Sequence, residues 1–259
     1  MSRLAVIRRI VLTGTLLGVG CSSPRAERAA NVEPRVQDDT VPKTSVVLLV
    51  DVSQSFAPFG KPDQAGLESV AAALSHLVVD TWEKPVQLFV SLIGESSFNA
   101  VQPCGPPVAY RSVLVAPQGN HAQLGRRELT KPDVLQAWWR ECVGNLTKAA
   151  ERPQRFTDVS SALLLAEQTS AAIEGRRIVI VASDLVESLP PGAIPAKLSL
   201  SQQEVLLLYK FETADTPNPN RVIARIAEWE KRLTAGGAKA VKHMPLQTAT
   251  AGTIIQILQ

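Results

Sequence analysis

The sequence predicts an α/β domain with a doubly wound, mostly parallel central sheet, one antiparallel edge strand and helices on both faces. Apolar runs of strand length alternate along the chain with stretches of helical periodicity, which is typical of a parallel sheet. The strand-like runs are apolar at most positions, as in strands that are covered on both faces. Residues 44–259 leave about 215 residues for this one domain, a size that buries a substantial core.

The elements are predicted from their hydrophobic patterns and flanking turn residues. The expected strands are Ser45 to Asp51, Pro85 to Gly94, Arg177 to Ala182, Gln203 to Tyr209 and Lys239 to His243. The expected helices are Gln64 to Asp80, Lys131 to Ala149, Asp158 to Glu174, Asn218 to Thr234 and Gln247 to Gln259. The alternating run Val108 to Ala116 is the expected edge strand beside the second strand. Segments 94–107 and 189–197, which contain Pro and Gly, and segment 118–130, which contains Gly, are expected to be loops.

Residues 1–20 have the pattern of an export signal, because three Arg residues precede an apolar run, Ile10 to Gly20, that is too short to span a bilayer comfortably. The segment Leu17 to Cys21 resembles a bacterial lipobox, which implies that Cys21 is lipidated. Gly18 stands where that motif has a bulky apolar residue, and the Gly-Val-Gly before the Cys also fits ordinary signal cleavage. We therefore expect a lipid-anchored protein of the bacterial cell envelope, with a soluble secreted protein as the alternative.

Residues 21–43 are expected to form a flexible tether, since they are polar, contain Pro and lack hydrophobic periodicity. The chain has 27 basic and 24 acidic residues, and the three Arg of the signal account for the excess. No basic surplus remains to favour nucleic acid, and no later stretch is long and apolar enough to cross a membrane. We expect no nucleic-acid partner, and membrane attachment only through the N-terminal lipid.

Two further cysteines, Cys104 in a Pro- and Gly-rich loop and Cys142 in a predicted helix, are expected to pair in an oxidising compartment. The alternative is two separate buried thiols. A zinc site is not indicated, because no CxxC motif and no paired His accompany these cysteines.

Polar side chains follow the first predicted strand at the point where it ends, at Asp51, Ser53 and Ser55. In open parallel sheets ligands bind beyond the carboxyl ends of the strands, a rule that also selects Ser183 and Asp184 after the run 178–182. Carboxylate and hydroxyl oxygens suit a hard divalent cation. The alternative is that these residues only form turns and cap the following helix.

Three segments together resemble the von Willebrand factor type A fold with its metal-ion-dependent adhesion site. They are Asp51-x-Ser53-x-Ser55 after an apolar strand, Thr157 followed by Ala-Leu at a helix start, and Asp184 at the end of another strand. Their order and separations fit the family, and the resemblance covers residues 44–259. Family members commonly have Gly just before the Thr and just after the last Asp, whereas Phe156 and Leu185 stand there in this chain.

The resemblance implies a Mg²⁺ or Mn²⁺ ion contacted by the hydroxyls of Ser53, Ser55 and Thr157. Asp51 and Asp184 would act on it directly or through water, and the sixth position would be left for an Asp or Glu of a protein partner. Where the two carboxylates contact the ion only through water, the ion keeps enough positive charge to attract an anionic ligand.

The function implied is that of a binding module that catalyses nothing. One alternative is a metal-independent scaffold or assembly component of an envelope complex. A weaker alternative is a phosphatase-like hydrolase of the haloacid-dehalogenase type, which also begins at an Asp after an apolar strand but has a second acid where Ser53 stands here. The sequence contains no G-x-S-x-G elbow, no Gly-rich phosphate loop and no His-based triad.

Overall fold

The computed structural model of the chain describes residues 42–56, 63–95, 97, 102–111, 128–152, 154–211 and 218–259. The predicted signal segment, Cys21 and the tether up to residue 41 lie outside these residues. Seven strands form one sheet in the order β4-β3-β2-β1-β5-β6-β7. They are β1 (Thr44–Asp51), β2 (Val86–Ile93), β3 (Val108–Tyr110), β4 (Glu128–Leu129), β5 (Arg176–Ser183), β6 (Glu204–Tyr209) and β7 (Ala240–Pro245).

The sheet is mostly parallel, as the sequence predicts. β1 pairs in parallel with β2 and β5, and parallel pairing continues to β6 and β7. β3 pairs antiparallel with β2. The edge prediction needs one correction, because the two-residue strand β4 pairs outside β3 and lies in a segment expected to be a loop. Two residues are too few to produce an alternating pattern in the sequence.

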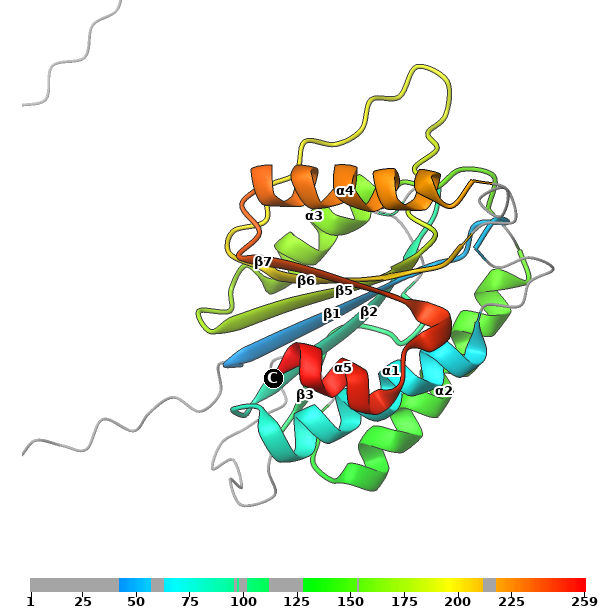
Figure 1. The fold of residues 1–259 in the computed structure, drawn as a ribbon. Helices are drawn as coiled ribbons and strands as arrows, with labels where there is room; N and C mark the ends of the chain where they lie inside the picture. The colour runs from blue at the N-terminus through cyan, green and yellow to red at the C-terminus, as the bar shows by residue number, and fades with distance from the viewer. Residues whose placement is uncertain are drawn as a thin grey trace, which may run out of the picture. The chain divides into compact units, whose positions relative to one another are not determined.

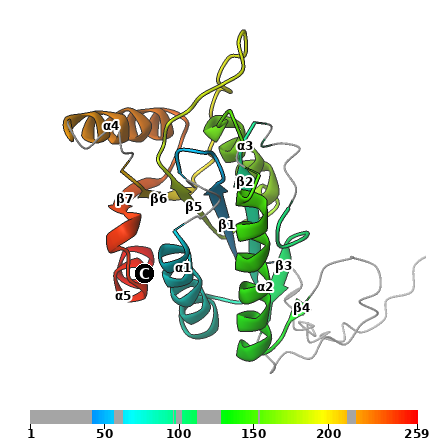
Figure 2. The same ribbon diagram turned by 90° about the vertical axis from the view of Figure 1, so that its right-hand side faces the viewer.

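Five α-helices cover the two faces of the sheet. They are α1 (Gln64–His76), α2 (Pro132–Ala150), α3 (Val159–Ser170), α4 (Asn220–Ala235) and α5 (Ala251–Leu258). Alternate residues of β1 supply two cores: Val46 and Leu48 pack with residues of α1, α2 and α5, and Val47 and Leu49 pack with residues of α3 and α4. Figure 1 and Figure 2 show these two helical layers on either side of the sheet.

The helix ends differ from the predicted ones at three places, the first of which is the end of α3 at Ser170 rather than Glu174. After His76, α1 continues as a π-helical turn, Leu77–Thr81. The last predicted helix is divided into a 3₁₀ turn, Leu246–Thr248, and α5, whose start is capped by reciprocal hydrogen bonds of Thr250 and Thr253. Within the described parts of the chain, no helix has the length and apolar character needed to cross a bilayer.

The predicted disulfide is present between Cys104, in the loop before β3, and Cys142 in α2. The bond connects residues 38 positions apart, so it ties this loop to the helix that covers the same side of the sheet. A disulfide of this kind is typical of proteins in oxidising compartments.

Candidate functional site

Asp51 is the last residue of β1 and is fully buried. The backbone N–H of Ser53 donates to its Oδ1 at 2.7 Å, and the hydroxyl of Ser183 donates to its Oδ2 at 2.6 Å. β1 is the central strand of the sheet and has a neighbour on each side, so the carboxylate is held at the middle of the carboxyl edge.

Ser53 and Ser55 follow in the loop that leaves β1. Their hydroxyl oxygens lie 3.2 Å apart, and Ser53 is buried whereas Ser55 is exposed. The loop is tied to β2, because Val52 N–H donates to the Ile93 carbonyl at 3.2 Å. Of the two hydroxyls that follow Asp51, that of Ser53 is therefore in the interior and that of Ser55 is at the surface.

Asp184 follows directly after β5, and its side chain is buried as well. Its Oδ1 accepts from the Val186 N–H at 2.9 Å. Its Oδ2 is buried and has no hydrogen-bond partner among the described residues. A buried carboxylate oxygen without a partner carries a desolvation cost that a bound cation would remove.

Thr157 lies in the segment that leads into α3 and is also buried. Its backbone pairs with Ser188, through N···O distances of 2.7 and 2.9 Å in the two directions. Three residues earlier, Gln154 forms a bridge with Ser53. Segment 154–157 thus contacts both the loop that follows Asp184 and the loop that follows Asp51.

The two buried carboxylates influence each other electrostatically. Burial and, to a smaller extent, the negative charge of Asp184 together raise the pKa of Asp51 to about 7, against hydrogen bonds from Ser183 and Ser53 that lower it. Burial also raises the pKa of Asp184, while the Ser55 hydroxyl, the Val186 N–H and the positive charges of Arg225 and Lys210 act in the opposite direction.

Leu185, directly after Asp184, has a backbone conformation that glycine adopts more easily. Its φ is +61°, in the left-handed region that glycine enters most easily. The side chain is buried, and the indole N–H of Trp229 donates to the Leu185 carbonyl at 2.9 Å. The backbone conformation that favours glycine is therefore formed by a leucine that tertiary contacts hold in place.

The roles of two residues of the site were not predicted. The Ser183 hydroxyl accepts from the Leu185 N–H at 2.9 Å while donating to Asp51, so it connects the ends of β1 and β5. Lys210, directly after β6, donates from Nζ to the Phe56 carbonyl at 2.7 Å and fixes the end of the Asp51 loop. Ser183 is signalled only by a hydroxyl beside Asp184 at a strand end, and Lys210 by no local pattern.

These residues fit a hard divalent cation. They offer two carboxylates and three hydroxyls, with one buried carboxylate oxygen unsatisfied, and oxygen donors are what Mg²⁺ and Mn²⁺ prefer. Within the residues that the structure describes, no group of three or more His, Cys, Asp or Glu side chains is placed to hold a metal ion. A cation at this edge would therefore depend on the Ser and Thr hydroxyls.

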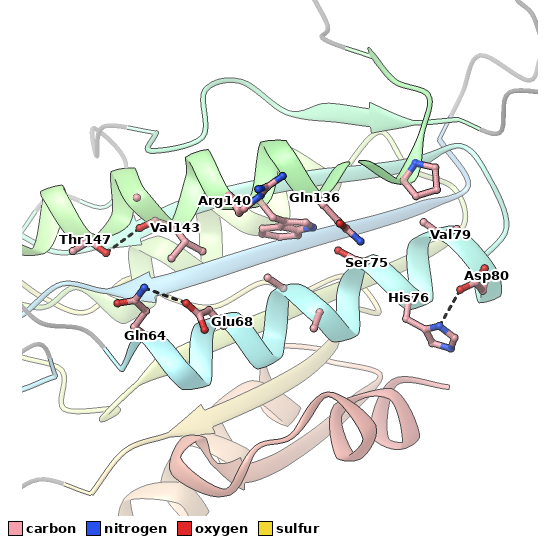
Figure 3. A pocket seen from close by; sticks show the side chains of 15 residues that line it. Gln64, Glu68, Ser75, His76, Val79, Asp80, Gln136, Arg140, Val143 and Thr147 are labelled. Carbon is pink, nitrogen blue, oxygen red and sulfur yellow. Dashed lines mark hydrogen bonds and ion pairs between the residues drawn. The ribbon is translucent and has the colours of Figure 1, made fainter. Parts of the chain in front are cut away.

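A groove of about 650 Å³ lies elsewhere, between α1 and α2. Figure 3 shows its walls, with Gln64 bonded to Glu68 on α1 and Arg140 and Thr147 on α2. Its floor includes Trp139, one of two adjacent buried tryptophans. None of the predicted cation ligands lines this groove.

Comparison with known proteins gives likenesses of fold at low identity. No family model matches the chain, and no curated protein matches it. The human COPII-coat protein Sec24c is 7% identical, with 79% of this chain and 30% of that chain covered and a TM-score of 0.41. Three N-terminal domains of the type V pili tip protein Mfa5 from Porphyromonas gingivalis are 15% identical, with 61% and 23% covered and a TM-score of 0.33.

The manganese-loaded Plasmodium vivax TRAP protein is 13% identical, with 84% of this chain and 62% of that chain covered and a TM-score of 0.32. The chain thus spans less than two thirds of each of these three solved chains.

Proposed function

We propose that this domain is a binding module that engages an acidic group of a protein partner through a divalent cation, Mg²⁺ or Mn²⁺. The observation that carries the proposal is the pair of buried carboxylates, Asp51 and Asp184, at one edge of the sheet. The Oδ2 of Asp184 has no partner in the described part of the chain, and the Ser55 hydroxyl, which lies 3.2 Å from that of Ser53, lowers the pKa of Asp184.

The residues of the chain have separate roles in this proposal. The hydroxyls of Ser53, Ser55 and Thr157 would hold the cation, with Asp51 and Asp184 balancing its charge directly or through water. Neutral hydroxyl ligands leave the ion electrophilic, so the bound ion supplies attraction for a carboxylate of the partner. Ser183 keeps Asp51 oriented by donating to Oδ2. Catalysis is not part of the proposal.

We further propose that the protein works outside the cytoplasm, attached through a lipid on Cys21. The disulfide between Cys104 and Cys142 supports export, because such bonds persist in oxidising compartments.

One observation favours a second candidate function, a scaffold that works without metal. Both oxygens of Asp51 already accept hydrogen bonds from the protein, and two cationic side chains, Lys210 and Arg225, act on Asp184. These hydrogen bonds and positive charges would balance the two buried carboxylates, so the fold would persist without a cation.

Isothermal titration of Mg²⁺ and of Mn²⁺ tests the proposal, on the wild type and on the double variant Asp51→Ala with Ser53→Ala. We expect saturable binding at one site in the wild type and none in the variant. Ser45→Ala is the matched control, because this buried hydroxyl lies at the other end of β1 and has no partner among the described residues. Absence of binding at millimolar cation, or partner capture that survives Asp51→Ala, would favour the scaffold.

A further inference from the structure

The groove of about 650 Å³ between α1 and α2 is lined by residues that recur every three to four positions on both helices. On α1 and its π-helical turn they include Gln64, Glu68, Ala71, Ser75 and Val79. The facing residues of α2 have the same spacing, from Pro132 to Thr147. Fifteen positions at the rise of a helix make the groove about 22 Å long.

The shape of the groove suits an α-helix. Two walls of helical spacing leave between them a hollow that receives the side chains of a third helix. An extended segment fits less well, because the backbone groups of α1 and α2 are bonded within each helix and offer it no hydrogen-bond partners. A helix satisfies its own backbone, so it needs none.

Gly144 lies in the interior of α2 and lines the groove. Glycine at such a position makes a helix less stable than alanine does. Apart from the backbone of its own helix, a Cβ atom added here would meet no atom of the described residues within 4 Å. Packing inside the fold therefore does not require a glycine at this position, whereas close approach of a bound segment to the α2 backbone would.

Trp139 forms part of the floor of the groove. It is 4% exposed, and its indole N–H has no acceptor within the described residues. A buried donor without a partner carries a free-energy cost that an oxygen of a bound segment would remove. Its neighbour Trp138 also lacks an acceptor among these residues but does not line the groove, so it provides a comparison.

Charged side chains stand near both ends of the groove and between them, as Figure 3 shows. Glu68, near one end, accepts a hydrogen bond from Gln64 at 3.1 Å. Asp80, at the other end, pairs with His76 at 2.9 Å. Among the described residues, neither carboxylate pairs with Lys or Arg, and Arg140 lies between them on the α2 wall. The order acid, base, acid is complementary to a segment with the order base, acid, base.

We propose that this groove is a docking site for an amphipathic α-helix of a partner protein, about four turns long. The apolar face of that helix would pack over Gly144, and basic side chains near its two ends would pair with Glu68 and Asp80. An acid between them would meet Arg140 and accept from the Trp139 N–H. Because the two carboxylates are 12 positions apart, basic residues about 11 positions apart, on one face of a helix, would reach both. This site is separate from the candidate cation site and does not depend on it.

Two labelled helical peptides of about 18 residues test the proposal by fluorescence anisotropy, in chelator so that no cation contributes. Both have the same apolar face of Leu and Ala. The matched peptide has Lys at two positions 11 apart and Glu between them, and in the reversed peptide Lys and Glu are exchanged. We expect the matched peptide to bind the wild type roughly tenfold more tightly.

Arg140→Glu should remove this preference for the matched peptide. Lys148→Glu, an equal change of charge at an exposed position of α2 outside the groove, should keep it. Trp139→Phe should weaken the matched peptide more than Trp138→Phe does, because only Trp139 lines the groove. Equal effects of the two Trp variants would overturn the contact with the indole N–H.

Gly144→Leu should abolish binding of both peptides by filling the hollow. The variant should fold, and its midpoint in urea should be at least that of the wild type, because the added Cβ has open space and Leu favours a helix. Ala137→Leu, at an exposed position of α2 outside the groove, is the matched control and should bind as the wild type does.

Three results would overturn the docked helix: no binding of the matched peptide, equal binding of the two peptides, or unchanged binding by Gly144→Leu. An apolar dye that binds the wild type but not Gly144→Leu, when neither peptide binds, would assign the groove to a small amphiphilic molecule instead. Self-association of the wild type that Gly144→Leu abolishes, measured by sedimentation without peptide, would assign it to a second copy of the chain.

Discussion

Leu185 occupies a backbone conformation that L-amino acids adopt at a cost. At φ +61° the cost for a non-glycine residue is about 1–2 kcal/mol. Full burial of a leucine side chain contributes about 1.5–3 kcal/mol, which is enough to offset it. The loop that carries Asp184 is therefore set by packing against the α3 and α4 side of the core rather than by a glycine.

Replacement of Leu185 by Gly and by Ala separates the cost of the left-handed backbone from the stabilisation by the buried side chain. Both variants lose the buried side chain, at a cost of about 2–5 kcal/mol. Only Gly relieves the left-handed backbone, so we expect Leu185→Gly to be at least as stable as Leu185→Ala in urea unfolding. Leu163, buried within α3, is the control, since Gly there should be less stable than Ala by about 1 kcal/mol. The same order at both positions would contradict the explanation.

Ser183 orients Asp51 through a hydrogen bond to its carboxylate. We expect Ser183→Ala to weaken Mn²⁺ binding by about 10–100-fold, the usual effect of losing a group that orients a metal ligand. Titration with Mn²⁺ measures this. Ser91→Ala makes the same change on β2, where the buried hydroxyl has no partner among the described residues, and should leave Mn²⁺ affinity unaltered. Equal loss in both variants would show that the role of Ser183 is only structural.

At the scale of elements, the disulfide joins the loop before β3 to α2. Closing a loop of 38 residues stabilises the fold by about 4 kcal/mol in the chain-entropy treatment. We expect the double variant Cys104→Ser with Cys142→Ser to lose about this much in denaturant unfolding. Cation binding should persist, because neither cysteine lies in a segment that carries the candidate ligands. Loss of cation binding in the folded variant would show that α2 influences the site.

Strands and helices could be predicted from the sequence wherever their hydrophobic pattern extends over many residues. β1 and β5 are nearly continuous apolar runs, and their ends gave Asp51 and Asp184 directly. β4 was missed because it has two residues. The roles of Ser183 and Lys210 were missed for a different reason. Their partners, Asp51 and Phe56, are 132 and 154 residues away along the chain, so no local pattern contains these contacts.

At the scale of the whole molecule, the two buried carboxylates make stability depend on pH in an unusual direction. The pKa of Asp51 rises from its ordinary 3.8 in the unfolded chain to about 7 in the fold. The folded state therefore holds this proton more tightly, and the contribution of Asp51 to stability falls as pH rises from about 4 to 7. Acids paired with basic side chains have the opposite effect, as Glu204 does, whose pKa is lowered by Arg176 and Lys239 against its burial.

Asp51→Asn isolates this contribution, because the amide does not titrate. In chelator, we expect the stability of the wild type relative to Asp51→Asn to fall by about 3 kcal/mol between pH 5 and pH 8. Urea unfolding of both proteins at the two pH values gives the difference directly. A constant difference across this range would mean that Asp51 is ionised throughout in the folded state.

Magnesium should restore the stability that the wild type loses as pH rises, since a cation and a proton compete for the carboxylate of Asp51. At pH 8, Mg²⁺ at one hundred times its dissociation constant should stabilise the wild type by about 2.7 kcal/mol. At pH 5 the same concentration should stabilise it less, because the proton on Asp51 must first be displaced. Asp51→Asn should show little response at either pH. Thermal unfolding of the two proteins with and without MgCl₂ therefore tests whether the buried carboxylates are balanced by a metal ion. An equal shift in both proteins would assign the effect to cations bound elsewhere on the surface.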